Sequence, residues 1–181
     1  MTLPVKSTVD RNGGETDVQD EQGQYLTFCL RGEMFAIGIL HIKEILEYGQ
    51  LTPVPMMPEY IRGVINLRGA VVPVVDLAAR FGQLCSAITK RTCIVIIEAA
   101  GDEGRQDIGV VVDSVSEVLE IPDGEIEPAP AFGAKIRTDF ISGMGKVNAK
   151  FVIILAVDKV LSVGELGQLE RVATEHASTL A

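Results

Sequence analysis

Two similar copies of a strand-rich segment constrain the fold of this chain more than any other feature. The segment at 35–47, FAIGILHIKEILE, resembles the segment at 108–120, IGVVVDSVSEVLE, at a constant offset of 73 residues. Glu44 and Glu117 form one of the matched pairs, and a loop containing prolines follows each copy. The repeat predicts two small subdomains of the same design.

A second pair of matching segments follows the two loops. Residues 61–76, IRGVINLRGAVVPVVD, resemble residues 141–158, ISGMGKVNAKFVIILAVD, and each has a strand–turn–strand pattern. The offset is 80 at Ile61 but 82 where Asp76 matches Asp158, so we expect small insertions between the copies. A unit of roughly 60–70 residues is marginal alone, so the two subdomains are expected to share an apolar interface.

Composition favours β-structure and excludes several classes of function. The chain is 47% hydrophobic with 5% aromatic residues, and branched side chains of this kind suit strands. Sixteen basic and 25 acidic residues give a net charge of −9 without a basic stripe, which argues against nucleic acid and anionic membranes. The longest apolar run, 151–157, is far shorter than the roughly 20 residues of a membrane helix. The N-terminus has no apolar stretch typical of a secretion signal, so we expect a soluble cytoplasmic protein.

Local patterns predict short strands joined by tight turns. A hairpin is expected to begin at Gln24 and to turn at Gly32-Glu33, and the helical spacing of hydrophobic residues in HIKEILEY, 41–48, predicts a short helical turn. Asp76 should cap a brief helix in LAARFG. Further strands are expected on both sides of Arg68-Gly69, at 91–99, at 106–113, and at 139–147 and 150–157 around Asn148.

The two ends of the chain differ from the middle. Residues 1–23 are polar and lack periodicity, which predicts a disordered tail. Residues 164–181 are predicted to form an amphipathic helix after the main domain at 24–163. The cysteines are odd in number and lack CxxC spacing, so we expect reduced thiols that are buried or half-buried at Cys29, Cys85 and Cys93.

No pattern in the chain predicts catalysis, a cofactor or a metal. Asp113 follows an apolar strand as a phosphate-accepting aspartate would, but Asp76 and Asp158 do the same. Alternating helices of a receiver domain are missing, so all three are expected to cap the turns that follow strands. The two histidines lack neighbouring ligands at metal spacing, and no P-loop or GxSxG is present.

Residues 24–163 resemble the CheW family, the coupling proteins of bacterial chemotaxis arrays. The resemblance lies in YLTFCLRGEMFAIGILHIKEILEY, DIGVVVDSVSEVLEI, DFISGMGKV and above all YIRGVINLRGAVVPVVDLAARFG. The combination of IxGVxNLRG with the following VPVVDL is highly specific. It also occurs in regulatory domains of chemotaxis kinases and in CheV-type couplers, whose kinase or receiver domains have no counterpart in these patterns, so a stand-alone coupler is expected.

The resemblance implies a mainly β fold of two intertwined five-stranded SH3-like barrels that share an apolar core, with short connecting helices. It further implies a non-catalytic scaffold between the cytoplasmic hairpin tips of methyl-accepting chemoreceptors and the regulatory domain of the histidine kinase CheA, recruited to membrane-associated arrays. One subdomain would dock on the kinase, and a groove between the barrels would take the receptor hairpin. Self-association in array rings is left open. Matched by position, the residues that the family uses for coupling are Ile42, Glu44, Gly63 and Arg68.

Two alternatives stay open. A sensor domain that binds a small ligand between the barrels would gain thermal stability from that ligand. Arg68 at its hairpin tip is either an idle surface charge or an interface residue, since Arg suits directed hydrogen bonds. Strand alternation places Ile65 and Leu67 on one face and Asn66 on the other, so Arg68→Glu should leave the fold intact.

Overall fold

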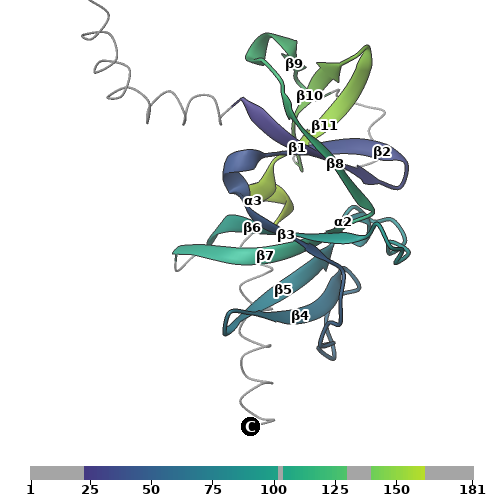
Figure 1. Ribbon diagram of the computed structural model, residues 1–181, viewed down its shortest axis with the longest axis vertical. Helices are drawn as coiled ribbons and strands as arrows, with labels where there is room; N and C mark the ends of the chain where they lie inside the picture. Colours follow the sequence, from purple (N-terminus) through teal and green to yellow (C-terminus); the bar gives the residue numbers. More distant parts are fainter. Residues whose placement is uncertain (1–22, 102–103, 130–139, 162–181) are drawn as a thin grey trace, which may run out of the picture.

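The computed structural model describes residues 23–101, 104–129 and 140–161, whose strands form two sheets (Figure 1). The first sheet, at the top of Figure 1, has the strand order β8-β1-β2-β11-β10-β9. Its strands are β1 Gln24–Leu30, β2 Glu33–Gly38, β8 Ser114–Glu120, β9 Ile126–Glu127, β10 Ile141–Val147 and β11 Lys150–Leu155.

The second sheet lies below the first in Figure 1 and has the order β3-β6-β7-β5-β4. Its strands are β3 Ile42–Glu47, β4 Ile61–Leu67, β5 Ala70–Asp76, β6 Cys93–Gly101 and β7 Gly104–Val112. In the described ranges, four short helical segments connect or follow the strands: η1 Ile39–His41, α2 Leu77–Arg80, η2 Asp123–Glu125 and α3 Val157–Val160.

The chain crosses between the sheets twice, which makes the two subdomains intertwined. It begins in the first sheet with β1 and β2, builds the whole second sheet with β3 to β7, and returns to the first sheet with β8 to β11. The mainly β fold class with two SH3-like subdomains is therefore confirmed. The first sheet carries β9 as a sixth strand of two residues.

The repeat explains this topology strand by strand. Strands β6, β7, β5, β4 and β3 of the second sheet correspond to β1, β2, β11, β10 and β8 of the first, and each sheet has one parallel pair, β5 with β7 and β11 with β2. Register shifts occur between Ile61 and Gly63 in one copy and between Ile141 and Gly143 in the other. The two copies are thus built alike down to their bulges.

The offset of 80 holds to the end of the second repeat segment, so the insertion predicted within that segment is absent, while the change from 73 to 80 lies between the two matched segments. The Asp76 amide donates to the Tyr60 carbonyl at 2.6 Å, and the Ala156 amide donates to the Phe140 carbonyl at 2.8 Å. Ala156 is therefore the counterpart of Asp76. The predicted match with Asp158 is wrong because Asp158 lies inside α3, past the position that precedes the helix.

A shared apolar core joins the two sheets. Phe28 and Phe35 of the first sheet continue through Phe81, after α2, to Phe140, with ring centroids 5.7–6.0 Å apart at each step. These four rings belong to one buried cluster that also contains Val95 and other residues of the second sheet. Full burial of one such side chain contributes about 1.5–3 kcal/mol, so the expected shared interface is a main source of stability.

The hairpin turns follow the requirements of strand twist. Arg31 and Gly32 have φ values of 50° and 81°, and Arg68 and Gly69 have 53° and 87°. Positive φ at both central positions is typical of a two-residue type I′ turn, which matches the right-handed twist of the flanking strands. The turn expected at Gly32-Glu33 therefore lies one residue earlier, at Arg31-Gly32.

The predicted helical turn in 41–48 is wrong, because Ile42–Glu47 forms strand β3. Its backbone pairs with β6, and its residues alternate between half-buried and exposed. Three hydrophobic residues at helical spacing fit either structure when the segment is this short. The matching segment of the repeat has valines at 115 and 118, which favour a strand.

Other predictions have mixed outcomes. The strands and turns around Arg68-Gly69 and Asn148 are confirmed. Cys85 is exposed, contrary to prediction, because it lies on the loop between α2 and β6, while Cys29 and Cys93 are half-buried; all three are free thiols. Of the tail predicted at 1–23, residues 1–22 lie outside the described residues, as does the helix predicted at 164–181. Within the described part, no helix is long and apolar enough to cross a membrane.

Candidate functional site

Glu44 and Arg68, two of the four predicted site residues, form an ion pair that joins opposite edges of the second sheet. Arg68 Nη2 lies 3.1 Å from Glu44 Oε2. Glu44 is on β3 and Arg68 follows β4, and these are the two edge strands, so the sheet curls until its edges meet, as in a barrel. The Arg68 side chain is 80% exposed and that of Glu44 is 25% exposed.

The β4–β5 turn fixes the position of Arg68. The Asn66 side chain accepts a hydrogen bond from the Gly69 amide at 2.9 Å, which closes the turn around Arg68. Glu44 is the ion-pair partner of Arg68 in the described part of the chain. A guanidinium has five N–H donors in a rigid plane, so most of its donors face solvent at this tip.

A second group of charges lies next to this pair. Lys43 Nζ lies 2.9 Å from Asp107 Oδ1 and 3.9 Å from Glu98 Oε2, and Arg105 Nη1 is 4.0 Å from the other Glu98 oxygen. The hydrogen bond to Asp107 raises the pKa of Lys43 above its ordinary value, and the charges of Asp107 and Glu98 act in the same direction. The positive charge of Arg68 acts in the opposite direction. Alternating charges therefore extend across β3, β6 and β7.

Ile42 and Gly63, the other two predicted site residues, have packing roles in the fold. Ile42 is half-buried against the shared core, two residues before Glu44 on β3. Gly63 is buried at φ 149°, where a Cβ atom would lie 2.5 Å from the Thr52 carbonyl oxygen. Thr52 and Val64 exchange backbone hydrogen bonds of 2.9 Å, so Gly63 lets the proline loop approach β4 closely. The structure does not bring these two residues into the ion pair.

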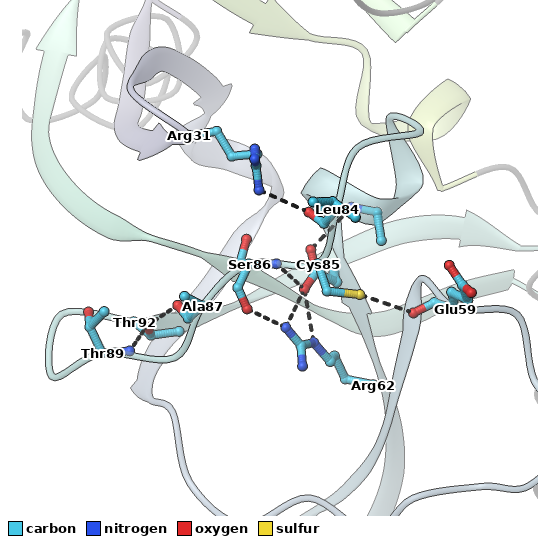
Figure 2. Close-up of polar contacts among 11 residues, drawn as sticks. Arg31, Glu59, Arg62, Leu84, Cys85, Ser86, Ala87, Thr89 and Thr92 are labelled. Atoms are coloured by element: carbon cyan, nitrogen blue, oxygen red, sulfur yellow. Dashed lines mark hydrogen bonds and ion pairs between the residues drawn. The ribbon is translucent and has the colours of Figure 1, made fainter.

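Arg62 and Asp76 form a buried ion pair that the sequence analysis did not predict. Figure 2 shows Arg62 and its contact with Ser86. Arg62 Nε and Nη2 lie 2.9 and 2.8 Å from Asp76 Oδ2, and Nη2 also donates to the Ser86 carbonyl. Asp76 is completely buried, and it also accepts from the amides of Ser86 and Ala79. The predicted capping of α2 by Asp76 is confirmed. The pair fastens the loop after α2 to the β4–β5 hairpin.

The other two aspartates have different structural roles from the one predicted. Asp113 accepts a hydrogen bond of 2.7 Å from the Arg31 amide in the β1–β2 turn, and Asp158 accepts one of 3.4 Å from the Ala100 amide. Neither caps the segment that follows its own strand, because both reach across to a distant hairpin. Within the described residues, no group of three or more His, Cys, Asp and Glu side chains could hold a metal ion.

Exposed apolar side chains lie near the Glu44–Arg68 pair in the sequence. Ile45 follows Glu44 on β3, Val71 lies three residues after Arg68 on β5, and Met56 is fully exposed in the proline loop. Sequence patterns assign such residues to the core, since an exposed isoleucine or valine looks the same as a buried one. They give this subdomain exposed apolar contact area in addition to its charges.

A large groove lies on the first subdomain. It has a volume of about 710 Å³, and its apolar walls include the exposed Met34 and Phe151. Strands β1, β2, β8, β10 and β11 supply its lining. The space between the two sheets is filled by the shared core, with a residual cavity of about 10 Å³ near Leu77 and Val110.

Comparison with known proteins agrees with the geometry. Residues 24–165 match the family model described as a CheW-like domain. The chain is 34% identical over 170 residues to chemotaxis protein CheW of Klebsiella aerogenes, covering 94% of this chain and 98% of that protein. It is 38% identical over 137 residues to chemotaxis protein CheW of Bacillus subtilis, covering 75% of this chain and 85% of that protein.

A solved structure shares the fold as well as the sequence. It is the crystal structure of scaffolding protein TtCheW from Thermoanaerobacter tengcongensis, which is 34% identical and superimposes with a TM-score of 0.71. The similarity covers 80% of this chain and 90% of that one. The family model, the sequence matches and the paired sheets agree, and the chain belongs to the CheW family.

Proposed function

We propose that this protein is a chemotaxis coupling protein, an adaptor that links chemoreceptor tips to the regulatory domain of the kinase CheA without catalysing a reaction. Family membership supports the proposal, because the matched relatives are chemotaxis proteins and the solved neighbour is a scaffolding protein. We place it in the cytoplasm, recruited to membrane-associated receptor arrays.

The exposed position of Arg68 is the observation that carries the proposal. Its guanidinium is held at a tight turn next to Glu44, yet 80% of the side chain remains accessible. A surface pair of this kind contributes little to folding, typically about 0.2–1 kcal/mol. A planar guanidinium that is already oriented suits directed hydrogen bonds to a partner's carboxylate or carbonyl groups. We assign the kinase-facing surface to this tip.

The resemblance implied a groove between the barrels for the receptor hairpin; because the shared core packs between the sheets, we assign the hairpin instead to the groove of the first subdomain. Its apolar walls and its volume of about 710 Å³ suit the apolar face of a helix. The two surfaces then belong to different subdomains that share one core. An adaptor transmits a receptor's state only if its affinity for one partner depends on the conformation of the other, and a shared core supplies a physical path for such coupling.

Charge reversal at Arg68 tests the proposal in an array reconstituted from receptor, kinase and coupling protein. Arg68→Glu should abolish receptor-dependent kinase activation, because it places a second carboxylate beside Glu44 and removes the donor fork. Arg91→Glu is the matched control, since Arg91 is an exposed arginine of the same subdomain that forms no ion pair within the described residues. It should activate normally.

Both variants should retain the free energy of unfolding of the unmodified protein, measured by urea denaturation, to within about 1 kcal/mol, as surface substitutions do. Normal activation by Arg68→Glu would refute the assigned surface. Unfolding of Arg68→Glu would show that Arg68 is a structural residue.

A further inference from the structure

Arg80, the last residue of α2, contacts one aromatic ring from each subdomain. Its guanidinium carbon lies 5.1 Å from the ring centroid of Tyr60 and 5.1 Å from that of Phe140. Arg80 Nε also donates a hydrogen bond of 3.0 Å to the Val160 carbonyl in α3. Phe140 and Val160 are buried, whereas Arg80 and Tyr60 are half-buried. A guanidinium that is partly removed from water is attracted to aromatic faces more strongly than an exposed one, so these contacts orient the Arg80 side chain.

These contacts join positions that correspond in the two repeats. Tyr60 and Phe140 are 80 residues apart, as are Arg80 and Val160, and α2 and α3 have the same offset. Arg80 therefore contacts its own counterpart as well as the matching ring of each copy. Because the counterpart is a valine, the place where the copies meet brings together one charge and not two like charges.

Each ring lies directly before a strand that leads to one of the two assigned surfaces. Tyr60 precedes β4, which ends at the turn that carries Arg68. Phe140 precedes β10, and this strand lines the groove of the first subdomain with Ile141, Met144 and Val147. The Tyr60 carbonyl also accepts from the Asp76 amide at the end of β5, and the Phe140 carbonyl accepts from the Ala156 amide after β11. A displacement of either hairpin is therefore passed to the ring at its base.

Arg80 responds to such a displacement differently from the surrounding core. Phe81 and Phe140, with ring centroids 6.0 Å apart, also join the subdomains, but hydrophobic burial has no preferred direction. The planar guanidinium of Arg80 contacts two rings and a carbonyl at once, and a hydrogen bond weakens steeply when its angle becomes unfavourable. Movement of Phe140 relative to Tyr60 therefore costs Arg80 at least one of its contacts.

We propose that Arg80 is the positioning residue that couples the groove of the first subdomain to the Arg68 tip of the second. A partner bound at one surface selects one arrangement of its hairpin, and Arg80 makes the other hairpin follow. The affinity at the second surface then depends on occupancy of the first. Packed and hydrogen-bonded side chains carry such coupling when they have two discrete arrangements. This inference rests on the proposed adaptor function, which assigns the two surfaces.

The test measures linkage with the full chain, the isolated regulatory domain of CheA and a soluble receptor fragment that contains the cytoplasmic hairpin. Isothermal titration gives the affinity for the kinase domain with and without saturating receptor fragment. In the unmodified protein the fragment should change that affinity at least fivefold. Arg80→Met keeps an unbranched apolar side chain but loses the charge and the donors. It should leave each separate affinity within twofold and reduce the change to less than twofold.

Further variants separate coupling from folding. Arg80→Lys keeps the charge but loses the planar donor group, so it should retain an intermediate change. Tyr60→Leu removes one ring at a half-buried position and should reduce the coupling as Arg80→Met does, which keeps the test valid if Arg80→Met does not fold. Arg91→Met, at an exposed arginine of the same subdomain, is the matched control and should show the full change.

The outcomes distinguish this inference from the adaptor function. Full coupling in both Arg80→Met and Tyr60→Leu would overturn the role of Arg80, and so would an unmodified protein that binds both partners independently. Loss of both separate affinities in Arg80→Met would show that Arg80 acts only in folding. Failure of the unmodified protein to bind either partner would instead refute the adaptor function and, with it, the assignment of the two surfaces.

Discussion

The two subdomains share one fold but differ in their arginines. The β4–β5 hairpin of the second sheet carries Arg62 and Arg68, whereas the corresponding hairpin of the first sheet carries Ser142 and Asn148 at an offset of 80. Backbone geometry is nevertheless alike, since Arg68 and Asn148 both have φ values near 50°. The hairpin therefore adopts its conformation without either arginine, and the role of each arginine has to be explained separately.

The two arginines differ in how deeply their ion pairs are buried. Asp76, the partner of Arg62, is completely buried, while Arg68 is 80% exposed beside Glu44. Removing one member of a buried pair leaves an uncompensated charge and typically costs about 3–5 kcal/mol. An exposed pair is worth about 0.2–1 kcal/mol. The first pair is thus a structural clamp, and the second leaves its arginine free for recognition.

The largest effect is expected at Asp76. Asp76→Ala should lower the free energy of unfolding by about 3 kcal/mol or more, because Arg62 loses its partner and two backbone amides lose their acceptor. The matched control is Asp158→Ala, whose exposed carboxylate accepts one long hydrogen bond and should cost less than about 1 kcal/mol. Urea denaturation measures both. Equal losses would mean that the two aspartates are equivalent after all.

The repeat made most of this fold predictable. Turn residues and alternating strands located the hairpins, and the internal match showed that two similar units were present. Three hydrophobic residues in β3 suggested a helix because a six-residue segment is too short for periodicity to decide. The pairing of β3 with β6 decided it instead, and such long-range pairing leaves no local trace in the sequence.

The site was predictable in part. Glu44 and Arg68 were expected as separate positions, but their contact depends on closure of the sheet between its two edges, which the sequence does not show. The Arg62–Asp76 pair left a usable signal. Regular pairing from a hairpin turn at Arg68-Gly69 would put Arg62 opposite Val75, next to the aspartate that ends β5, whereas the bulge in β4 puts Ile61 opposite Val75. Counting back from the turn would have found it.

An intermediate effect on the free energy of unfolding is expected for substitution of the glycine that lies under a loop in each repeat, Gly63 in one copy and Gly143 in the other. A Cβ atom on Gly63 would lie 2.5 Å from the Thr52 carbonyl oxygen at a φ of 149°. A Cβ atom on Gly143 would instead lie 2.7 Å from the Ile126 side chain, which can move more easily than backbone. Gly63→Ala should therefore cost on the order of 1–3 kcal/mol in unfolding free energy, and Gly143→Ala should cost less. Chemical denaturation of both variants measures the difference, and the reverse order would contradict it.

The smallest effect is expected at the exposed pair, where a double-mutant cycle measures the interaction directly. Glu44→Ala, Arg68→Ala and the double variant should give a coupling energy of about 0.2–1 kcal/mol. Added salt should reduce it further, because solvent screens charges at an exposed tip. The cycle of Arg62→Ala and Asp76→Ala is the internal reference and should give a larger, less salt-sensitive coupling. A coupling above about 2 kcal/mol for Glu44 and Arg68 would exceed the range of exposed pairs. Arg68 would then serve the closure of the barrel, and the contrast between the two arginines would be lost.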